Sequence, residues 1–131
     1  MKRNPKCIPF ATHHYPVRIF FVPTRADWDA VMRDVGIAGE SYAQQGGQVT
    51  SATCEGHEDR IFICFGDQCD KSTWEEVVGV MAHECVHVLQ NVEESINGKL
   101  GDEPQAYFVQ SLLLWLIAEY RKAGRGWRDG E

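Results

Sequence analysis

Residues 80–90 read VMAHECVHVLQ and place two histidines and a glutamate in a helix that is otherwise apolar. Apolar residues recur at spacings of three and four through this stretch and around it, which predicts that one side of the helix is buried. Upstream, Ser72-Thr-Trp-Glu75 has the pattern of a capping box, which predicts that the helix starts there. Asn97 and Gly98 predict its end. The predicted buried stripe consists of Trp74, Val77, Val78, Met81, Cys85, Val88, Leu89 and Val92.

The polar residues of this helix form the pattern H-E-x-x-H, with His83, Glu84 and His87. Histidines four residues apart project from the same face of a helix, so both imidazoles can converge on one Zn²⁺ at about 2.0 to 2.1 Å. Glu84 is placed to face a water on that metal rather than to bind the metal itself. The alternative is that the histidines only pack or form hydrogen bonds. The position of the motif on a capped, amphipathic helix favours a metal site.

A catalytic zinc usually has three protein ligands and one open position, so a third ligand is needed. The extended motif with a later glycine and histidine is absent, because Gln90 and Glu93 occupy those positions. Glu103, at the start of the next predicted helix, is within reach if residues 95–101 carry the chain back toward the motif. Asp102 is the alternative, and a water, a more distant residue or no third ligand is also left open.

Residues 72–120 resemble the gluzincin branch of the zincin metallopeptidases, the thermolysin-like group. In that group an H-E-x-x-H helix is followed by a helix that presents a glutamate ligand, often with a small residue and an aromatic just after it. The small size of the chain also resembles stand-alone zincin domains of phage and bacterial genomes. The residues that carry the resemblance are His83, Glu84, His87, Glu103, Ala106 and Tyr107.

This resemblance implies a zinc metallopeptidase that hydrolyses peptide bonds in a peptide or protein substrate. Zn²⁺ would be held by His83, His87 and Glu103 and would lower the pKa of a bound water toward about 7, with Glu84 as the general base. Tyr107 would contact a ligand or the oxyanion, or else pack against the active helix. Two other functions stay open: a zinc-stabilised module that binds peptide or protein without cutting it, and a hydrolase of a non-peptide amide. Glu84 argues against the module, since a purely structural site needs no base.

Three segments upstream of the helix predict strands. Residues 16–23 and 60–65 are β-branched and aromatic runs, and residues 48–55 alternate weakly, which together with 60–65 indicates a hairpin. In zincins the strand before the active helix lies inside the sheet, and its antiparallel neighbour forms an edge over the cleft. By resemblance, residues 48–55 are that edge, to which an extended peptide could pair.

Two more helices complete the predicted fold. Thr24 and Gly36 predict the start and end of one, and the other is expected over about residues 103–123, apolar on most of its surface. We therefore expect a single α+β domain: a small mixed three-stranded sheet, one preceding helix, the H-E-x-x-H helix and a C-terminal helix that bears the third ligand. Residues 1–15 and 124–131 are expected to be loosely ordered.

Composition narrows the functional classes further. A length of 131 residues suits one domain, and a net charge of −6 argues against a nucleic-acid partner held by phosphate contacts. The N-terminus lacks the apolar run of a signal peptide, and the longest apolar run, residues 112–118, is too short to span a membrane. The five cysteines show no framework spacing, which predicts free thiols in a reducing compartment. We therefore expect a cytoplasmic protein without a membrane partner; the oligomeric state does not follow from the sequence.

Overall fold

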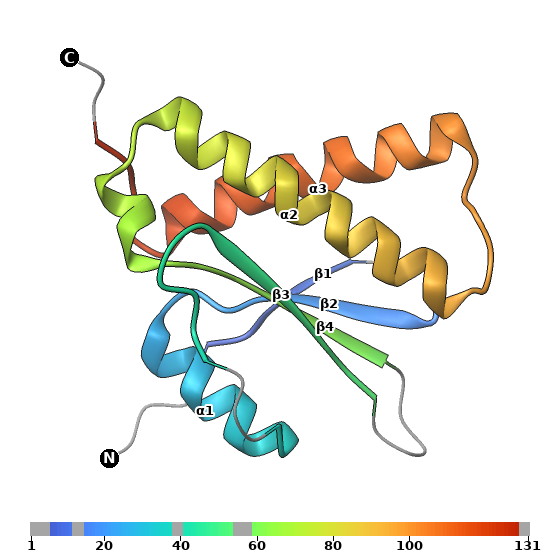
Figure 1. The fold of residues 1–131 in the computed structure, drawn as a ribbon, viewed down its shortest axis with the longest axis horizontal. Helices are drawn as coiled ribbons and strands as arrows, with labels where there is room; N and C mark the ends of the chain where they lie inside the picture. Colours follow the sequence, from blue (N-terminus) through green and yellow to red (C-terminus); the bar gives the residue numbers. More distant parts are fainter. Residues whose placement is uncertain (1–5, 12–14, 38–40, 54–58, 129–131) are drawn as a thin grey trace.

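The computed structural model shows a four-stranded mixed sheet with helices on both faces (Figure 1). It describes residues 6–11, 15–37, 41–53 and 59–128. The strand order is β1-β2-β4-β3, in which β2 and β4 are parallel and the other two pairs are antiparallel. In chain order the elements are β1 (Ile8–Phe10), β2 (Val17–Phe21), α1 (Arg25–Val35), β3 (Gly47–Ala52), β4 (Asp59–Phe65), the 3-10 helix η1 (Asp67–Lys71), α2 (Trp74–Ser95) and α3 (Asp102–Lys122).

The mixed sheet of an α+β domain is confirmed, but the predicted number of three strands is wrong. The fourth strand, β1, pairs with β2 at one edge of the sheet and lies within the N-terminal segment expected to be loosely ordered. Three residues with a central proline carry little strand signal in a sequence. Pro9 is tolerated there because an edge strand needs partners on one side only.

Side chains of β4 alternate between two apolar cores. Ile61, Ile63 and Phe65 face α2 and α3, whereas Phe62 and Cys64 face α1 on the opposite side. This alternation follows from the two-residue period of a strand. Because both faces of β4 are covered, this strand lies in the interior of the domain. Its antiparallel neighbour β3 is the last strand of the sheet and forms its outer edge.

The start of α2 lies one residue later than the predicted capping box. Thr73 is the N-cap, its hydroxyl accepts a hydrogen bond from the Glu76 N–H, and the Glu76 carboxylate accepts one from the Thr73 N–H. The Ser72 hydroxyl instead donates to the Gln68 carbonyl at 3.0 Å. Thr73-Trp-Glu-Glu76 fits the capping-box pattern as well as Ser72-Thr-Trp-Glu75 does. Ser72 is instead the C-cap residue of the preceding helix η1.

One buried carboxylate sets the register between α2 and α3, which run in opposite directions (Figure 1). Glu93 Oε2 accepts hydrogen bonds from Gln105 Nε2 at 2.6 Å and from the Leu100 N–H at 3.0 Å. These two donors, helped by the charge of Lys99, hold the pKa of Glu93 below its usual value. As a result, α3 begins beside the C-terminal end of α2.

The buried stripe predicted for α2 is largely confirmed, because Met81, Cys85, Val88 and Val92 are fully buried. Cys85 therefore belongs to the core, as expected. The described cysteines are free thiols, whereas Cys54 lies outside the described residues. Within the described ranges, no helix combines the length and the apolar character that crossing a membrane requires.

Candidate functional site

The two histidines of the motif meet on the exposed face of α2. Their Nε2 atoms are 3.1 Å apart, close to the separation of about 3.3 Å expected for two ligands of one tetrahedral zinc at 2.0 to 2.1 Å. His87 Nδ1 lies 3.1 Å from Oε1 of Gln90. Because an amide oxygen only accepts, the proton of His87 belongs on Nδ1, which leaves the Nε2 lone pair directed toward His83. The chemistry and spacing of this pair fit a zinc ion.

Glu84 lies on the flank of α2 that faces β3 and is only 5% exposed. Gly47 passes so close that a Cβ atom there would be 2.6 Å from Glu84 Cγ and 3.0 Å from the Phe65 ring. Burial raises the pKa of Glu84 above its usual value, and the charges of His87 and His83 lower it in part. A raised pKa suits a general base, whose efficiency is greatest when its pKa approaches the operating pH.

His83 and Glu84 open into the same cleft, which has a volume of about 580 Å³ and lies between the start of β3 and the first half of α2. Three of its lining residues are glycines, so much of the wall is backbone. The motif therefore borders a space large enough for a substrate. The lining residues are Gly46, Gly47, Glu76, Gly79, Val80, His83 and Glu84.

The predicted edge strand is confirmed in position. β3 is an outer strand of the sheet and its first residue, Gly47, lines the cleft, although the strand ends at Ala52 rather than at residue 55. Residues 54–58 lie outside the described residues.

The structure does not bring Glu103 to the histidines. Glu103 is exposed in the first turn of α3, whose N-cap is Gly101. Gln105 contacts Glu93, which is six residues or about 9 Å beyond His87 along α2. The start of α3 therefore lies too far along α2, because the chain turns at Leu100 instead of returning to the motif.

The described residues place no other candidate third ligand beside the histidine pair. Asp102 is exposed at the first position of α3, next to Glu103. Among the residues that the structure describes, no three His, Cys, Asp or Glu side chains are grouped so as to hold a metal ion. Tyr107 is 64% exposed, so the expected packing against α2 is not found. The motif thus offers two candidate ligands and a candidate base, and no third ligand joins them among the described residues.

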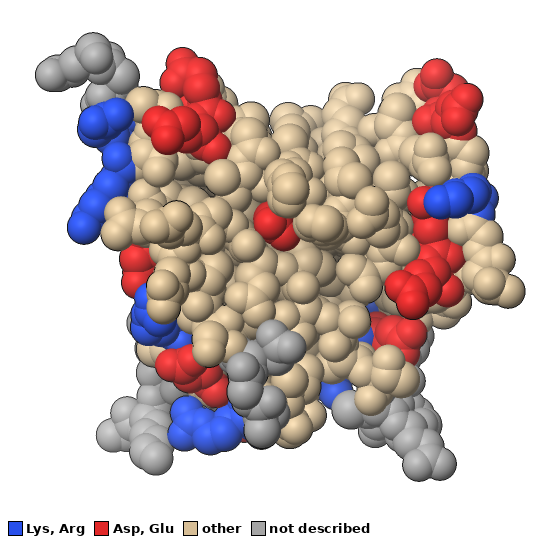
Figure 2. Space-filling model, viewed as in Figure 1, with Lys and Arg blue, Asp and Glu red and all other residues tan. Residues whose placement is uncertain are grey.

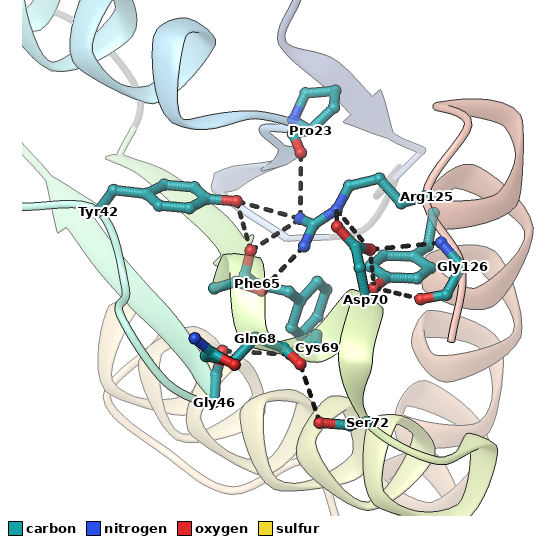
Figure 3. A network of polar contacts seen from close by, with 12 residues as sticks. Pro23, Tyr42, Gly46, Phe65, Gln68, Cys69, Asp70, Ser72, Arg125 and Gly126 are labelled. Carbon is teal, nitrogen blue, oxygen red and sulfur yellow. Dashed lines mark hydrogen bonds and ion pairs between the residues drawn. The ribbon is translucent and has the colours of Figure 1, made fainter. Parts of the chain in front are cut away.

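A buried arginine near the C-terminus binds the segment that follows β4 (Figure 3). The Arg125 guanidinium donates to the carbonyl oxygens of Phe65 at 2.7 Å, Gly66 at 2.8 Å and Pro23 at 3.2 Å, and to Asp70 at 3.1 Å. Its side chain is 7% exposed. This residue lies in the segment expected to be loosely ordered, and in the structure it is anchored in the fold.

The arginine network reaches the cleft through a backbone hydrogen bond. The Gly66 N–H donates to the Gly46 carbonyl at 2.8 Å, and Gly46 precedes the glycine that contacts Glu84. Tyr42 joins the network, because its hydroxyl donates to the Phe65 carbonyl and accepts from Arg125 at 3.0 Å. Burial raises the pKa of Tyr42 to about 12, so it stays a neutral donor.

Sequence reasoning missed both the glycine wall and the arginine. The Gly46-Gly47 pair stands in a polar stretch that reads as a loop, and Arg125 stands between two glycines near the chain end. No local sequence pattern predicts these roles, because Gly47 meets Glu84 and Arg125 meets Phe65 and Gly66 only in the folded chain.

Comparison of the chain with protein-family models, with curated proteins and with solved structures yields no match in any of the three. Any function assigned to this site is therefore inferred from its geometry and from the H-E-x-x-H motif.

Proposed function

We propose that this protein is a zinc-dependent metallopeptidase that hydrolyses peptide bonds, with His83 and His87 as metal ligands and Glu84 as general base. One observation carries the proposal: the two imidazole nitrogens lie 3.1 Å apart at the rim of a cleft that also holds a buried glutamate. The free thiols of Cys64 and Cys85 suit a reducing compartment, so we place the activity in the cytoplasm.

Each residue of the motif has a separate role. Zinc, when bound, supplies an activated water and a Lewis acid for the scissile carbonyl. Glu84 would accept a proton from the attacking water and pass it to the leaving amine; its burial favours the neutral form and so helps it to hold the proton between the two transfers. Gln90 fixes the ring of His87 through Nδ1, as outer partners of zinc ligands commonly do.

The substrate is expected to bind in an extended form along β3. The outer edge of this strand carries no neighbouring strand among the described residues, and it runs beside the cleft. A peptide that pairs with it would cross the cleft in front of Glu84, with main-chain hydrogen bonds providing much of the affinity.

The role of Glu103 as third ligand stays a prediction of the family resemblance. It requires α3 to shift along α2 and break the contact between Gln105 and Glu93. Zinc titration of Glu103→Gln decides the point. An unchanged zinc affinity assigns the metal to the histidines and water, whereas a large loss shows that α3 repacks around the metal.

One observation favours the second candidate, a zinc-stabilised module that binds peptide without cutting it. The described residues bring only two ligands together, and catalytic zinc sites usually have three. The position of Glu84 speaks for hydrolysis, because a module has no use for a buried carboxylate in its binding cleft.

Metal analysis and a peptide cleavage assay on wild type, Glu84→Gln and His83→Ala/His87→Ala separate these functions. Hydrolysis predicts that wild type binds zinc and cuts, that Glu84→Gln binds zinc without cutting, and that the double variant loses both. Zinc without cleavage in wild type supports the module. No bound zinc in wild type refutes both proposals, and cleavage by Glu84→Gln at the wild-type rate refutes the role of Glu84.

A further inference from the structure

Two glutamates mark the ends of the face of α2 that carries the histidines. Glu76 and Glu94 are 18 residues apart, which is five full helical turns, so they lie on one line about 27 Å long. His83 and His87 lie between them on nearly the same line. Both glutamates are exposed. The helix therefore presents carboxylate, imidazole pair and carboxylate in that order.

The seam between α2 and β3 contains a hollow on each side of the histidines. The cleft of about 580 Å³ lies on the Glu76 side, and a second one of about 320 Å³ lies on the Glu94 side. Gly47 of β3 lines the first and Ser51 lines the second, so the strand follows the helix from one hollow to the other. The second hollow is lined by Val17, Ser51, Thr53, Asp59, Ile61, Asn91, Glu94 and Ser95.

Apart from His83, the ionisable residues that line this groove are all acidic. Four carboxylates line the two hollows, from Glu76, Glu84, Asp59 and Glu94, and among the described residues no lysine or arginine does. Figure 2 shows acidic side chains over both ends of α2 and a mostly uncharged surface between them.

Glu76 carries a negative charge at neutral pH. Hydrogen bonds from the Thr73 side chain and N–H hold its pKa below the usual value. The charge of Arg128 adds a smaller effect in the same direction, but Arg128 does not line the groove. A cationic group in this end of the groove would therefore meet an ionised carboxylate.

We propose that the groove between β3 and α2 selects an extended peptide segment with a basic residue toward each end, one near Glu76 and one near Glu94. This inference rests on the proposed function, since it specifies the substrate of the same site. An extended chain rises about 3.3 Å per residue, so a span of about 27 Å corresponds to about eight residues. The two basic residues stand about four residues to either side of the bond that faces the histidines.

The experiment measures binding separately from cleavage. Full-length Glu84→Gln, loaded with zinc, is titrated into labelled peptides about ten residues long. The peptides share one sequence and differ only at the two outer positions, which are both lysine, both glutamine or both glutamate. Exposed ion pairs contribute little each, so we expect the lysine peptide to bind about 3- to 10-fold more tightly than the glutamine peptide. The glutamate peptide should bind more weakly than both, and the differences should shrink at high salt.

Charge variants locate the effect. Glu76→Gln/Glu94→Gln, added to Glu84→Gln, should remove the preference for lysine; glutamine also serves at this position of a capping box, so the start of α2 is kept. Glu75→Gln/Asp34→Asn removes two exposed carboxylates outside the groove and should leave the preference intact. Equal affinity for the lysine and glutamine peptides overturns the inference, and so does a preference that survives the groove variant. If wild type cuts no peptide while the preference holds, the metallopeptidase proposal fails and the basic-peptide groove stands.

Discussion

Gly47→Ala should disable the proposed site without touching the proposed metal ligands. The added Cβ would lie 2.6 Å from Glu84 Cγ, about 1 Å inside the usual carbon contact distance of 3.5 to 4.0 Å. It cannot move away, because the Phe65 ring stands 3.0 Å from it. Either Glu84 shifts by about this amount or the start of β3 retreats from α2.

The expected size of the effect follows from these contacts. Overpacking a buried site costs about 1 to 3 kcal/mol of stability. A misplacement of about 1 Å in a catalytic group costs about 100-fold in rate. We therefore expect kcat/KM for peptide cleavage to fall about 100-fold in Gly47→Ala while the zinc content stays that of wild type.

Peptide hydrolysis, zinc analysis and urea unfolding test this prediction together. Gly98→Ala is the matched control, because the nearest atom to its added Cβ is 3.9 Å away and Gly98 lines neither hollow. This control should keep the activity of wild type. A Gly47→Ala enzyme with wild-type kcat/KM and wild-type stability would show that Glu84 is not packed against Gly47 and would refute the reasoning.

Three further predictions address the metal, the arginine network and the pairing of α2 with α3. Gln90→Ala should weaken zinc binding about 10- to 100-fold in a competition titration, because His87 loses the partner of its Nδ1. Asn91→Ala, which removes a hydrogen bond to the His87 carbonyl and leaves the ring untouched, should not weaken it. Arg125→Met should lower the free energy of unfolding by about 3 kcal/mol in urea, since the carbonyls of Phe65 and Gly66 lose the buried guanidinium that donates to them. Arg25→Met, which breaks an ion pair that is half exposed, should cost at most about 1 kcal/mol, and equal losses would contradict the assignment. Because the folded-state pKa of Glu93 lies below its usual value of 4.5, its contribution to stability is complete above about pH 4.5 and is lost as the pH falls through the folded pKa. Glu93→Gln should therefore flatten the acid side of the stability curve measured by urea unfolding, and an unchanged slope would exclude Glu93 as its source.

Local patterns in the sequence predicted most of the elements. Thr24 and Gly36 bound α1 as expected, and the Asn97 region ends α2, because capping groups and left-handed residues act within a few positions of one another. The buried stripe of α2 follows from the helical period. The missed strand β1 and the cap shifted to Thr73 show where such patterns are ambiguous: three residues are too few for a strand signal, and two overlapping capping boxes fit the same segment.

For the candidate site, the spacing of His83 and His87 was enough to place their nitrogens together, since four residues make about one helical turn. Glu103 could not be placed in this way. Its distance from the motif depends on where the chain turns after α2, and that turn is set by Glu93 binding the Leu100 N–H and Gln105. From the sequence, Glu93 is expected on the surface of α2. It is buried in the structure because the Leu100 N–H, Gln105 and Lys99 meet its carboxylate in the folded chain.

The sequence by itself determined the helix and the positions of its two histidines and Glu84 on that helix, because a helical period converts spacing into direction. Only the tertiary structure decided what lies opposite that helix. It places Gly47 against Glu84, brings carboxylates to both ends of the groove, and lets Arg125 bind the carbonyls of Phe65 and Gly66. These contacts join residues that are far apart in the chain, and no local preference encodes them. They arise when β3, α2 and the C-terminal segment pack around one core and bring their backbones within hydrogen-bonding distance.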